Sequence, residues 1–383
     1  MPDPTRPPRV LLDATAVPAD RGGVGRYVDG LVGGLATGAV ARGELALTVV
    51  HVPGDTAFAG RPGVATVTAP AAVERSVPAR FAWEQTGLPR LARRLGVDVL
   101  HSPHYTLPLR SPVPVVVTVH DATFFSDPQW HSRVKGPFFR TWTRVAAHRA
   151  ARLVVPSEAT RDEVARHVGR GRAAVDVALH GVDHALFVPP SPAGVAALRA
   201  RLDVTGEYVG FLGTLEPRKN VPALVAGWAA AVRDRPDPPA LVLAGGAGWD
   251  PDVDAAIAAV PAPLRVIRAG YLDLALLPAL LGGAAVAAYP SLGEGFGLPV
   301  LEAMASGGAV LTTRRLSLPE VGGDAVAYCE PDAGSIATAL RDLLDADTTD
   351  LRARAVARAR EFTWARSADQ HLAAYRAAAG IHA

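Results

Sequence analysis

The residues with the clearest chemical potential lie in a glycine-rich segment in the second half of the chain. Glu294 and Glu302 are eight positions apart, and Gly295 and Gly297 lie between them. Glycine lets backbone N–H groups approach a ligand closely, and Pro299 suits the first position of a helix whose positive end would face the loop. Carboxylates here can accept hydrogen bonds from hydroxyl groups, including those of a ribose. The segment is therefore predicted to bind an anionic, hydroxyl-bearing ligand.

The alternative for either glutamate alone is a structural role, with Glu302 solvated on its helix and Glu294 in a turn. Their joint occurrence in one glycine-rich loop favours binding. Lys219 is a further candidate, because it is one of two lysines among 39 basic residues and follows Arg218 directly. A departing diphosphate needs cations and helix N-termini to stabilise its developing charge. Lys219 and Arg218 are therefore predicted to bind phosphate.

Two segments of the first half of the chain are also candidates. A glycine loop, residues 22–25, follows a short apolar run and precedes a helix-like pattern. His120 and Asp121 end the apolar run 113–120, which is typical of a buried parallel strand. Ligands bind beyond the carboxyl ends of such strands, which favours a functional histidine over a hydrogen-bonded core histidine.

The sequence shows no clear metal site. His101 and His104 have HxxH spacing, but Pro103 lies between them and no acidic partner is nearby. This pattern favours turn and packing roles for both histidines over zinc ligation.

Composition excludes several classes of protein. The chain has 383 residues, of which 49% are apolar, so disorder is excluded, and its net charge of +2 argues against nucleic-acid partners. A single cysteine, Cys329, excludes a disulfide framework and favours a reducing compartment. Residues 1–4 lack the apolar core of a signal peptide, and prolines and glycines interrupt the apolar stretch 274–288. We therefore expect a cytoplasmic protein.

Strands and helices alternate in two successive blocks. Short apolar runs at 9–14, 45–52, 97–101, 113–120, 152–156 and 175–178 predict the strands of the first block, and runs at 208–212, 240–244, 264–267, 286–289, 310–312 and 325–328 those of the second. This pattern predicts an α/β fold with two doubly wound, Rossmann-like domains, and a ligand in the gap between them. We expect domains at 1–188 and 198–362, a linker at 189–197, and a final helical segment at 363–383.

The ordered motifs resemble those of the retaining, nucleotide-sugar-dependent glycosyltransferases of family 4, which have the GT-B fold. The segment 294–307 is similar to the E-x7-E signature of that family. Five other segments match further landmarks in the same order, namely 22–25, 118–121, 155–160, 181–183 and 213–220. One departure is Thr214, where many relatives carry arginine, so that the paired cationic clamp of the family is incomplete. Either Arg218 completes the clamp, or Lys219 and helix dipoles are sufficient without it.

The resemblance implies a role for each matching residue. Glu302 would hold the ribose of the donor, Glu294 the hydroxyls of the transferred sugar, and Lys219 the diphosphate. Catalytic roles would fall to His120, Glu294 and Lys219. Donor contacts would come from Gly22, Gly23, Arg218, Lys219, Glu294, Gly295, Phe296, Gly297, Leu298 and Glu302. Acceptor contacts would come from Gly23, Val24, His120 and Asp121. The final helical segment would cross back to the first domain.

We therefore expect a metal-independent hexosyltransferase that needs no cofactor. The resemblance to mannosyltransferases of polysaccharide or glycolipid assembly favours GDP-mannose as the donor and a hydroxyl group of a glycan, lipid-linked or small-molecule acceptor. A sugar phosphorylase of the same fold is one alternative, and a catalytically inactive nucleotide-sugar-binding scaffold is another. A dehydrogenase is disfavoured because neither glycine loop, at Gly22 nor at Gly245, completes G-x-G-x-x-G.

The segment 131–152 is basic and aromatic. It contains six cationic residues and no acidic one, with Phe138, Phe139 and Trp142 among them. Such a segment is typical of a peripheral membrane contact or of a binder of a phosphorylated lipid, and we expect such contact at the inner face of a membrane. The alternative is an ordinary helix with a solvated basic face.

Overall fold

The computed structural model describes residues 6–17, 21–169 and 171–381, so the N-terminal residues 1–4 considered above lie outside it. The chain forms two compact units. Unit 1 comprises Met1–Gly181 and Thr363–Ala383, and unit 2 comprises Val182–Phe362. Within the described residues, no helix has the length and apolar character that a membrane span requires.

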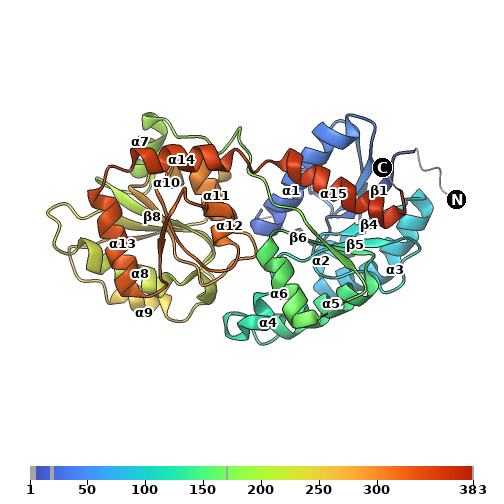
Figure 1. The fold of residues 1–383 in the computed structure, drawn as a ribbon, viewed down its shortest axis with the longest axis horizontal. Helices are drawn as coiled ribbons and strands as arrows, with labels where there is room; N and C mark the ends of the chain where they lie inside the picture. Colours follow the sequence, from blue (N-terminus) through green and yellow to red (C-terminus); the bar gives the residue numbers. More distant parts are fainter. Residues whose placement is uncertain (1–5, 18–20, 170, 382–383) are drawn as a thin grey trace. The chain divides into compact units, whose positions relative to one another are not determined.

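Unit 1 is built on a seven-stranded parallel sheet with the strand order β3-β2-β1-β4-β5-β6-β7 (Figure 1). The strands are β1 (Arg9–Asp13), β2 (Ala46–His51), β3 (Val64–Thr68), β4 (Val99–Ser102), β5 (Val115–Thr118), β6 (Arg152–Val155) and β7 (Ala174–Val177). The α-helices are α1 (Gly23–Leu35), α2 (Ala71–Arg75), α3 (Val77–Leu95), α4 (Thr123–Ser126), α5 (Lys135–Arg149), α6 (Glu158–Val168) and α15 (Trp364–Ala379).

Alternating apolar residues on the strands divide the core of unit 1 into two layers. Val10 and Leu12 of β1 pack with α1 and α15 on one face, while Leu11 packs with α3 and α5 on the other. Helix α15 lies beside α1, as Figure 1 shows, so the end of the chain completes the first unit. Ser157 caps α6, because its side chain accepts a hydrogen bond from the Thr160 N–H in the first turn of that helix.

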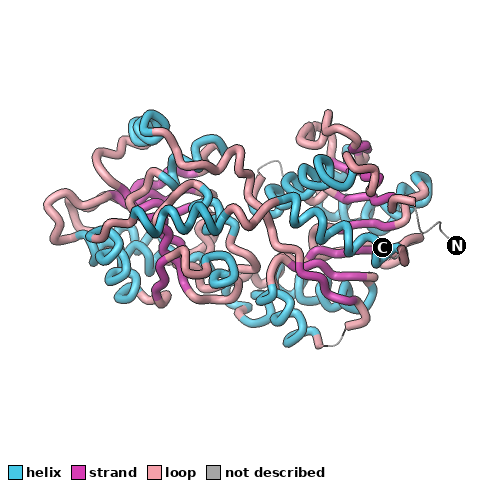
Figure 2. Tube along the Cα trace, turned by 45° about the horizontal axis from the view of Figure 1, so that its top comes forward, coloured by secondary structure: helices cyan, strands magenta, loops and turns pink. Residues whose placement is uncertain are grey.

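Unit 2 has a six-stranded parallel sheet with the order β10-β9-β8-β11-β12-β13. Its strands are β8 (Tyr208–Leu212), β9 (Ala240–Ala244), β10 (Val266–Gly270), β11 (Val286–Tyr289), β12 (Val310–Thr313) and β13 (Ala327–Cys329). Its α-helices are α7 (Pro192–Arg201), α8 (Val221–Val232), α9 (Val253–Ala258), α10 (Leu277–Gly282), α11 (Leu298–Ala305), α12 (Leu318–Gly322), α13 (Ala333–Asp345) and α14 (Thr349–Ala359). Figure 2 shows the helices around the strands of each unit. The prediction of two doubly wound domains is confirmed.

The segment expected to be a linker contains the start of a helix. Helix α7 begins at Pro192, and the Ser191 side chain accepts a hydrogen bond from the Gly194 N–H. Pro192 suits the first turn of a helix, where its missing N–H costs nothing. Pro192 therefore marks the start of a helix within the predicted linker.

Both sheets contain a point at which the order of the strands reverses. In unit 1 this point lies between β1 and β4, and in unit 2 it lies between β8 and β11. Connections leave these neighbouring strands in opposite directions, which opens a crevice at their carboxyl ends where ligands bind.

Candidate active site

The predicted donor residues of unit 2 lie at its strand-order reversal. Lys219 and Arg218 belong to a short 3-10 turn, Pro217–Lys219, in the loop after β8. Glu294 lies in the loop after β11, and only 6% of its surface is exposed. Backbone bonds join the two loops, because the Leu292 N–H donates to the Arg218 carbonyl at 2.8 Å. The fold therefore brings together residues 75 positions apart.

Glu294 lies at the centre of a hydrogen-bonded cluster. Its Oε1 accepts from Lys219 Nζ at 2.6 Å, from Ser291 Oγ at 2.7 Å and from the Tyr289 hydroxyl at 3.0 Å. Its Oε2 accepts from Arg218. Arg218 also donates to Glu216 Oε1 at 2.8 Å. The predicted trio of Glu294, Lys219 and Arg218 is thus one cluster.

The charges in this cluster determine its ionisation. Burial alone would raise the pKa of Glu294, but Arg218 and Lys219 outweigh it and lower the pKa to about 2. Burial, followed by the charge of Arg218, lowers the pKa of Lys219. Glu216 also belongs to the cluster, since its carboxylate lies 3.7 Å from Lys219 Nζ. The two cations, Lys219 and Arg218, are therefore balanced by two carboxylates, whereas the sequence had predicted an excess of positive charge here.

The glycine loop leads directly into α11. Gly297 has a φ of +101°, a conformation that side chains rarely adopt, and it caps a helix that begins at Leu298. Phe296 is buried and packs against Phe362 at a ring separation of 6.0 Å. Its side chain therefore supports the loop from the core. Glu302 is 2% exposed on α11.

A second loop braces the one that contains Lys219. The Leu215 N–H donates to the Gly246 carbonyl at 3.0 Å, next to Thr214. Gly248 has a φ of +64°, and a Cβ atom there would lie 1.9 Å from the Leu215 carbonyl oxygen. Only glycine fits this approach, so these loops are held together by backbone contacts.

The predicted residues of unit 1 lie at the start of α1 and at the end of β5. Gly22 is the N-cap of α1, and Gly23 is its first residue, with open space where a Cβ would lie on either. Val24 in the same turn is half-buried. His120 Nε2 lies 2.7 Å from the Pro103 carbonyl, so this nitrogen donates. Asp121 Oδ1 accepts from the Thr123 N–H and hydroxyl and so stabilises its own loop.

A chain of buried hydrogen bonds connects α15 to the centre of the sheet. His371 Nδ1 lies 2.7 Å from the Ser367 carbonyl, so this nitrogen donates. His371 Nε2 must then accept from the Tyr27 hydroxyl at 2.8 Å, since neutral histidine carries one N–H. The Tyr27 oxygen accepts in turn from the Thr118 hydroxyl at 2.8 Å.

The same chain continues through His101 and returns to α15 at Tyr375, one turn after His371. His101 Nε2 donates to Thr118 at 2.9 Å, and His101 Nδ1 accepts from the Tyr375 hydroxyl at 2.8 Å. Burial lowers the pKa of His101 and brings the pKa of His371 to about 4, so both imidazoles are neutral. These bonds agree with the packing role predicted for His101.

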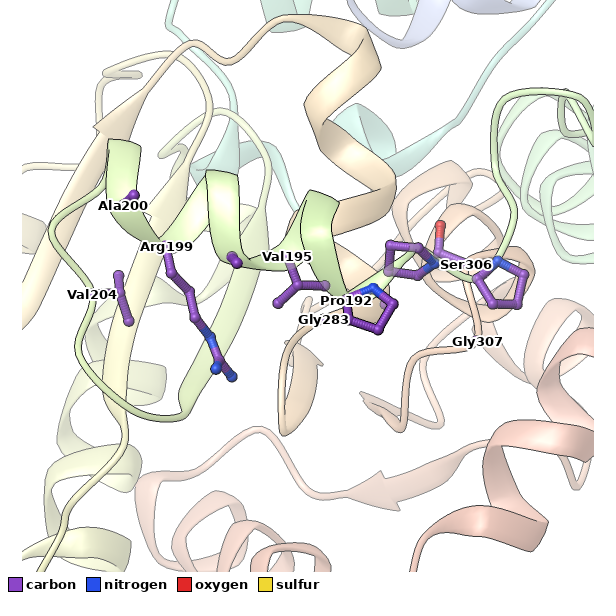
Figure 3. Close-up of a pocket in the computed structure, with 12 residues that line it drawn as sticks. Pro192, Val195, Arg199, Ala200, Val204, Gly283, Ser306 and Gly307 are labelled. Atoms are coloured by element: carbon purple, nitrogen blue, oxygen red, sulfur yellow. The ribbon is translucent and has the colours of Figure 1, made fainter.

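A hollow of about 650 Å³ lies in unit 2 beside α7 (Figure 3). Small and apolar side chains line most of it, and Arg199 is its one charged lining residue. The hollow is lined in part by Pro192, Val195 and Gly283 and by none of the predicted site residues. It therefore has a different location from the Glu294 cluster.

Sequence reasoning missed several residues that shape these clusters. Tyr289 and Ser291 contact Glu294, and Glu216 holds Arg218. Tyr289 could have been found from one signal, because it is a polar residue at the end of an apolar run. It ends β11, much as His120 comes shortly after the end of β5. No local pattern pointed to Tyr27 or His371, whose contact spans 344 positions.

Comparisons with known proteins assign the family. Residues 21–186 match the family described as Glycosyltransferase Family 4, and residues 206–346 match Glycosyl transferases group 1. The O-antigen chain mannosyltransferase B of Escherichia coli is 30% identical over 285 residues, which are 73% of this chain and 74% of that protein. The chain belongs to glycosyltransferase family 4. It is therefore an enzyme that transfers glycosyl groups, as the motifs predicted.

Other relatives of this glycosyltransferase act on different molecules. A D-inositol 3-phosphate glycosyltransferase of Segniliparus rotundus is 30% identical over 59% of this chain and 52% of its own length. Among solved structures, sucrose-phosphate synthase from Thermosynechococcus elongatus has a TM-score of 0.76 at 20% identity, over 96% of this chain and 98% of that one. HepE of Anabaena, in complex with UDP-glucose, has a TM-score of 0.72 at 19% identity, over the same shares. These structures confirm the GT-B fold.

Proposed function

We propose that this glycosyltransferase moves mannose from GDP-mannose to a hydroxyl group of a glycan, a lipid-linked or a small-molecule acceptor, with retention of configuration and without a metal. The observation that carries the proposal is the buried cluster of Glu294, Lys219 and Arg218 at the strand-order reversal of unit 2. The mannosyl group is favoured by the mannosyltransferase of E. coli to which the chain is similar.

Each part of the cluster suits one part of a nucleotide sugar. Glu294, whose pKa of about 2 keeps it ionised, would accept hydrogen bonds from the hydroxyls of the sugar. Lys219, Arg218 and the N-terminus of α11 would stabilise the charge that develops on the departing diphosphate. The helix N-terminus matters here because Glu294 and Glu216 offset the two cations. Glu302 would hold the ribose.

The departing phosphate would accept the proton of the attacking hydroxyl. A carboxylate with a pKa of about 2, such as that of Glu294, is a weak base and a weak nucleophile, which supports a reaction without a covalent glycosyl-enzyme. His120 would contribute its Nδ1 as an acceptor, since its Nε2 donates to Pro103. Its place beside the donor remains a prediction.

A thermal-shift screen against GDP-mannose and UDP-, ADP- and dTDP-sugars tests the donor. A ligand at about 100 times its Kd stabilises the folded state by about 2.7 kcal/mol, which raises Tm by about 5–10 °C for a unit of this size. We expect the largest rise with GDP-mannose and the loss of that rise in Glu302→Gln. A rise with another nucleotide sugar alone would reassign the donor, and product formation from free phosphate would support a phosphorylase.

We also propose that α5 of unit 1 contacts an anionic membrane surface. Val134 is 80% exposed before the helix and Phe138 is 41% exposed within it, and Val77 at the start of α3 is 67% exposed. Phe81 and Trp142 join Phe138 in one aromatic group, with ring separations of 5.2 to 6.5 Å. Exposed apolar side chains among cations are typical of a peripheral contact with anionic lipids.

Two residues of the predicted basic segment pack within unit 1 and do not contribute to this surface. Arg152 is the first residue of β6, and its guanidinium pairs with Asp176 at 2.5 Å and 2.6 Å. Phe139 packs inward against Tyr105 at a ring separation of 4.7 Å. The proposed contact surface is therefore smaller than the segment 131–152.

Removing the exposed apolar groups should weaken membrane binding. We expect Val134→Ser combined with Phe138→Ser to lower the fraction that cosediments with anionic vesicles at least threefold, because insertion of apolar side chains contributes to binding. Tyr271→Ser, which replaces a 62% exposed aromatic residue of unit 2, is the matched control. Equal binding of the wild-type protein to neutral and anionic vesicles would contradict the proposal.

A further inference from the structure

The short helix α12 braces the loop that carries Glu294. Ser317 immediately precedes this helix, and its hydroxyl donates to the backbone carbonyl of Glu294 at 2.8 Å. Leu318 begins the helix and lies so close to Gly297 that a Cβ atom there would be 2.8 Å from its Cδ2. Neither Ser317 nor Leu318 is exposed to solvent. The start of α12 therefore holds the glycine loop at two residues, which flank Phe296 in the sequence.

Arg358 of α14 holds the other end of α12. Its Nη2 donates to the Glu320 carbonyl at 2.8 Å, and its Nε donates to the Val321 carbonyl at 3.4 Å. Carbonyl groups in the last turn of a helix need partners from outside the helix, and Arg358 supplies them here. Its Nη1 donates to Glu361 at 2.5 Å. A guanidinium carries N–H groups in several fixed directions, so one side chain makes all of these contacts and joins α12 to α14.

The same guanidinium lies over the ring of Phe362. The distance from Arg358 Cζ to the ring centroid is 5.0 Å, which is within the range of a cation–π contact. Phe362 is 4% exposed, and its ring packs edge-on against that of Phe296 in the glycine loop. The contacts therefore form a closed path, which runs from Glu294 through α12, Arg358 and Phe362 back to Phe296.

The backbone of Phe362 is fixed independently of its ring. Its carbonyl oxygen accepts from the Val182 N–H at 3.2 Å and from His184 Nε2 at 3.1 Å. Glycine restricts the backbone least of all residues, so the loop 293–297, with three glycines, keeps one conformation only where other groups hold it. The anchored ring of Phe362 and the start of α12 are two such supports, and Arg358 contacts both.

We propose that Arg358 and Phe362 are positioning residues, which hold the glycine loop so that the Glu294 carboxylate meets the hydroxyls of the transferred sugar. This inference rests on the proposed function, because that function assigns the sugar contact to Glu294. Groups that bind a reacting substrate lose their effect when their supports allow small displacements. Lys219 and Glu302 lie on other elements, the loop after β8 and helix α11, so loss of either support should weaken binding of the sugar more than binding of the nucleotide.

The experiment measures Kd for GDP-mannose and for GDP by titration calorimetry, since only GDP-mannose carries the sugar. We expect Phe362→Leu, which removes the ring and keeps an apolar side chain, to raise Kd for GDP-mannose at least fivefold and to leave Kd for GDP within twofold. Arg358→Lys, which keeps the charge and loses the planar fork, should act in the same direction. The matched controls are Phe187→Leu, at a 4% exposed position before α7, and Arg360→Lys, at an exposed position after α14.

The ratio of the two Kd values separates positioning from a merely structural role, which would lower Tm or weaken both ligands equally. If the wild-type protein binds GDP-mannose and both variants keep the wild-type ratio, the assignment is overturned while the donor proposal stands. Arg358→Lys decides the question if Phe362→Leu does not fold, because its side chain is partly exposed. If the wild-type protein binds neither GDP-mannose nor GDP, the donor proposal fails, and the assignment fails with it.

Discussion

Replacement of Lys219 with glutamine should lower kcat/KM for the nucleotide sugar by a factor of about 10²–10³, the usual loss when one preorganised charge-stabilising donor is removed. The reason lies in the cluster around Glu294. Lys219 is 7% exposed, so its charge acts where little water screens it. Without it, Glu216 and Glu294 would outnumber Arg218, and the developing diphosphate charge would meet net repulsion. Steady-state kinetics with varied donor measure the effect.

The fold should tolerate this change. Glu294 keeps hydrogen bonds from Arg218, Ser291 and Tyr289, so the substitution does not leave a buried charge alone. The matched control is Arg341→Gln, which removes one exposed cation from α13 of the same unit. A variant Lys219→Gln that melts normally and retains half of the wild-type kcat/KM would show that Lys219 does not stabilise the departing diphosphate.

Replacement of His371 with glutamine should make the stability of the protein less sensitive to acid. The pKa of His371 is about 4 in the folded protein, chiefly through burial, against 6.5 for an unperturbed histidine. As pH falls below 6.5, His371 becomes protonated in the unfolded chain but stays neutral in the folded protein. The free energy of unfolding therefore decreases until the pH reaches about 4. At pH 5 this loss is about 2 kcal/mol for one histidine.

Denaturant unfolding at pH 7.5 and pH 5 measures this contribution. The difference in unfolding free energy between the two pH values should be about 2 kcal/mol smaller in His371→Gln than in the wild-type protein. Because the same pH difference is taken for the wild-type protein and for the variant, subtracting one from the other removes the opposite contribution of Glu84, whose pKa is raised to about 7 and whose protonation stabilises the fold on acidification. His148→Gln, at an exposed position, is the control. An unchanged difference would show that His371 is not a buried neutral group.

The hydrogen-bond chain adds to the effect of burial in opposing protonation of His371. A proton added to His371 Nε2 would point at the hydroxyl proton of Tyr27, which that nitrogen accepts at present. The Tyr27 hydroxyl could rotate away only if it gave up the hydrogen bond that it accepts from Thr118. Protonation therefore costs the orientation of several bonds as well as burial of a charge. The chain joins α15 to α1, β4 and β5 of the same unit, in addition to the apolar packing of this helix.

Local patterns were sufficient for most strands and for the helix Trp364–Ala379, which lies within the predicted helical segment 363–383. They failed for α3 and for the edge strand β3. Helix α3 contains Pro78 and Pro89, and prolines in a sequence usually indicate that a helix is interrupted. Pro78 lies in the first turn, and the burial of Leu88 and Leu91 around Pro89 compensates for the missing backbone bond. Residues 64–68 of β3 are largely exposed and showed no apolar run.

By itself, the sequence predicted which residues of unit 2 would bind an activated sugar. Glycine, proline and charge act over a few positions, so Glu294, Glu302 and the pair Arg218–Lys219 could be recognised locally. The tertiary structure alone decided how these charges are balanced and which groups lie together in unit 1. Tyr289 and Glu216 join the cluster around Glu294, and Asp13 lies near Glu84, only because strand order brings separate loops to one edge of each sheet. Electrostatic energy depends on distance in space, and sequence spacing does not encode that distance.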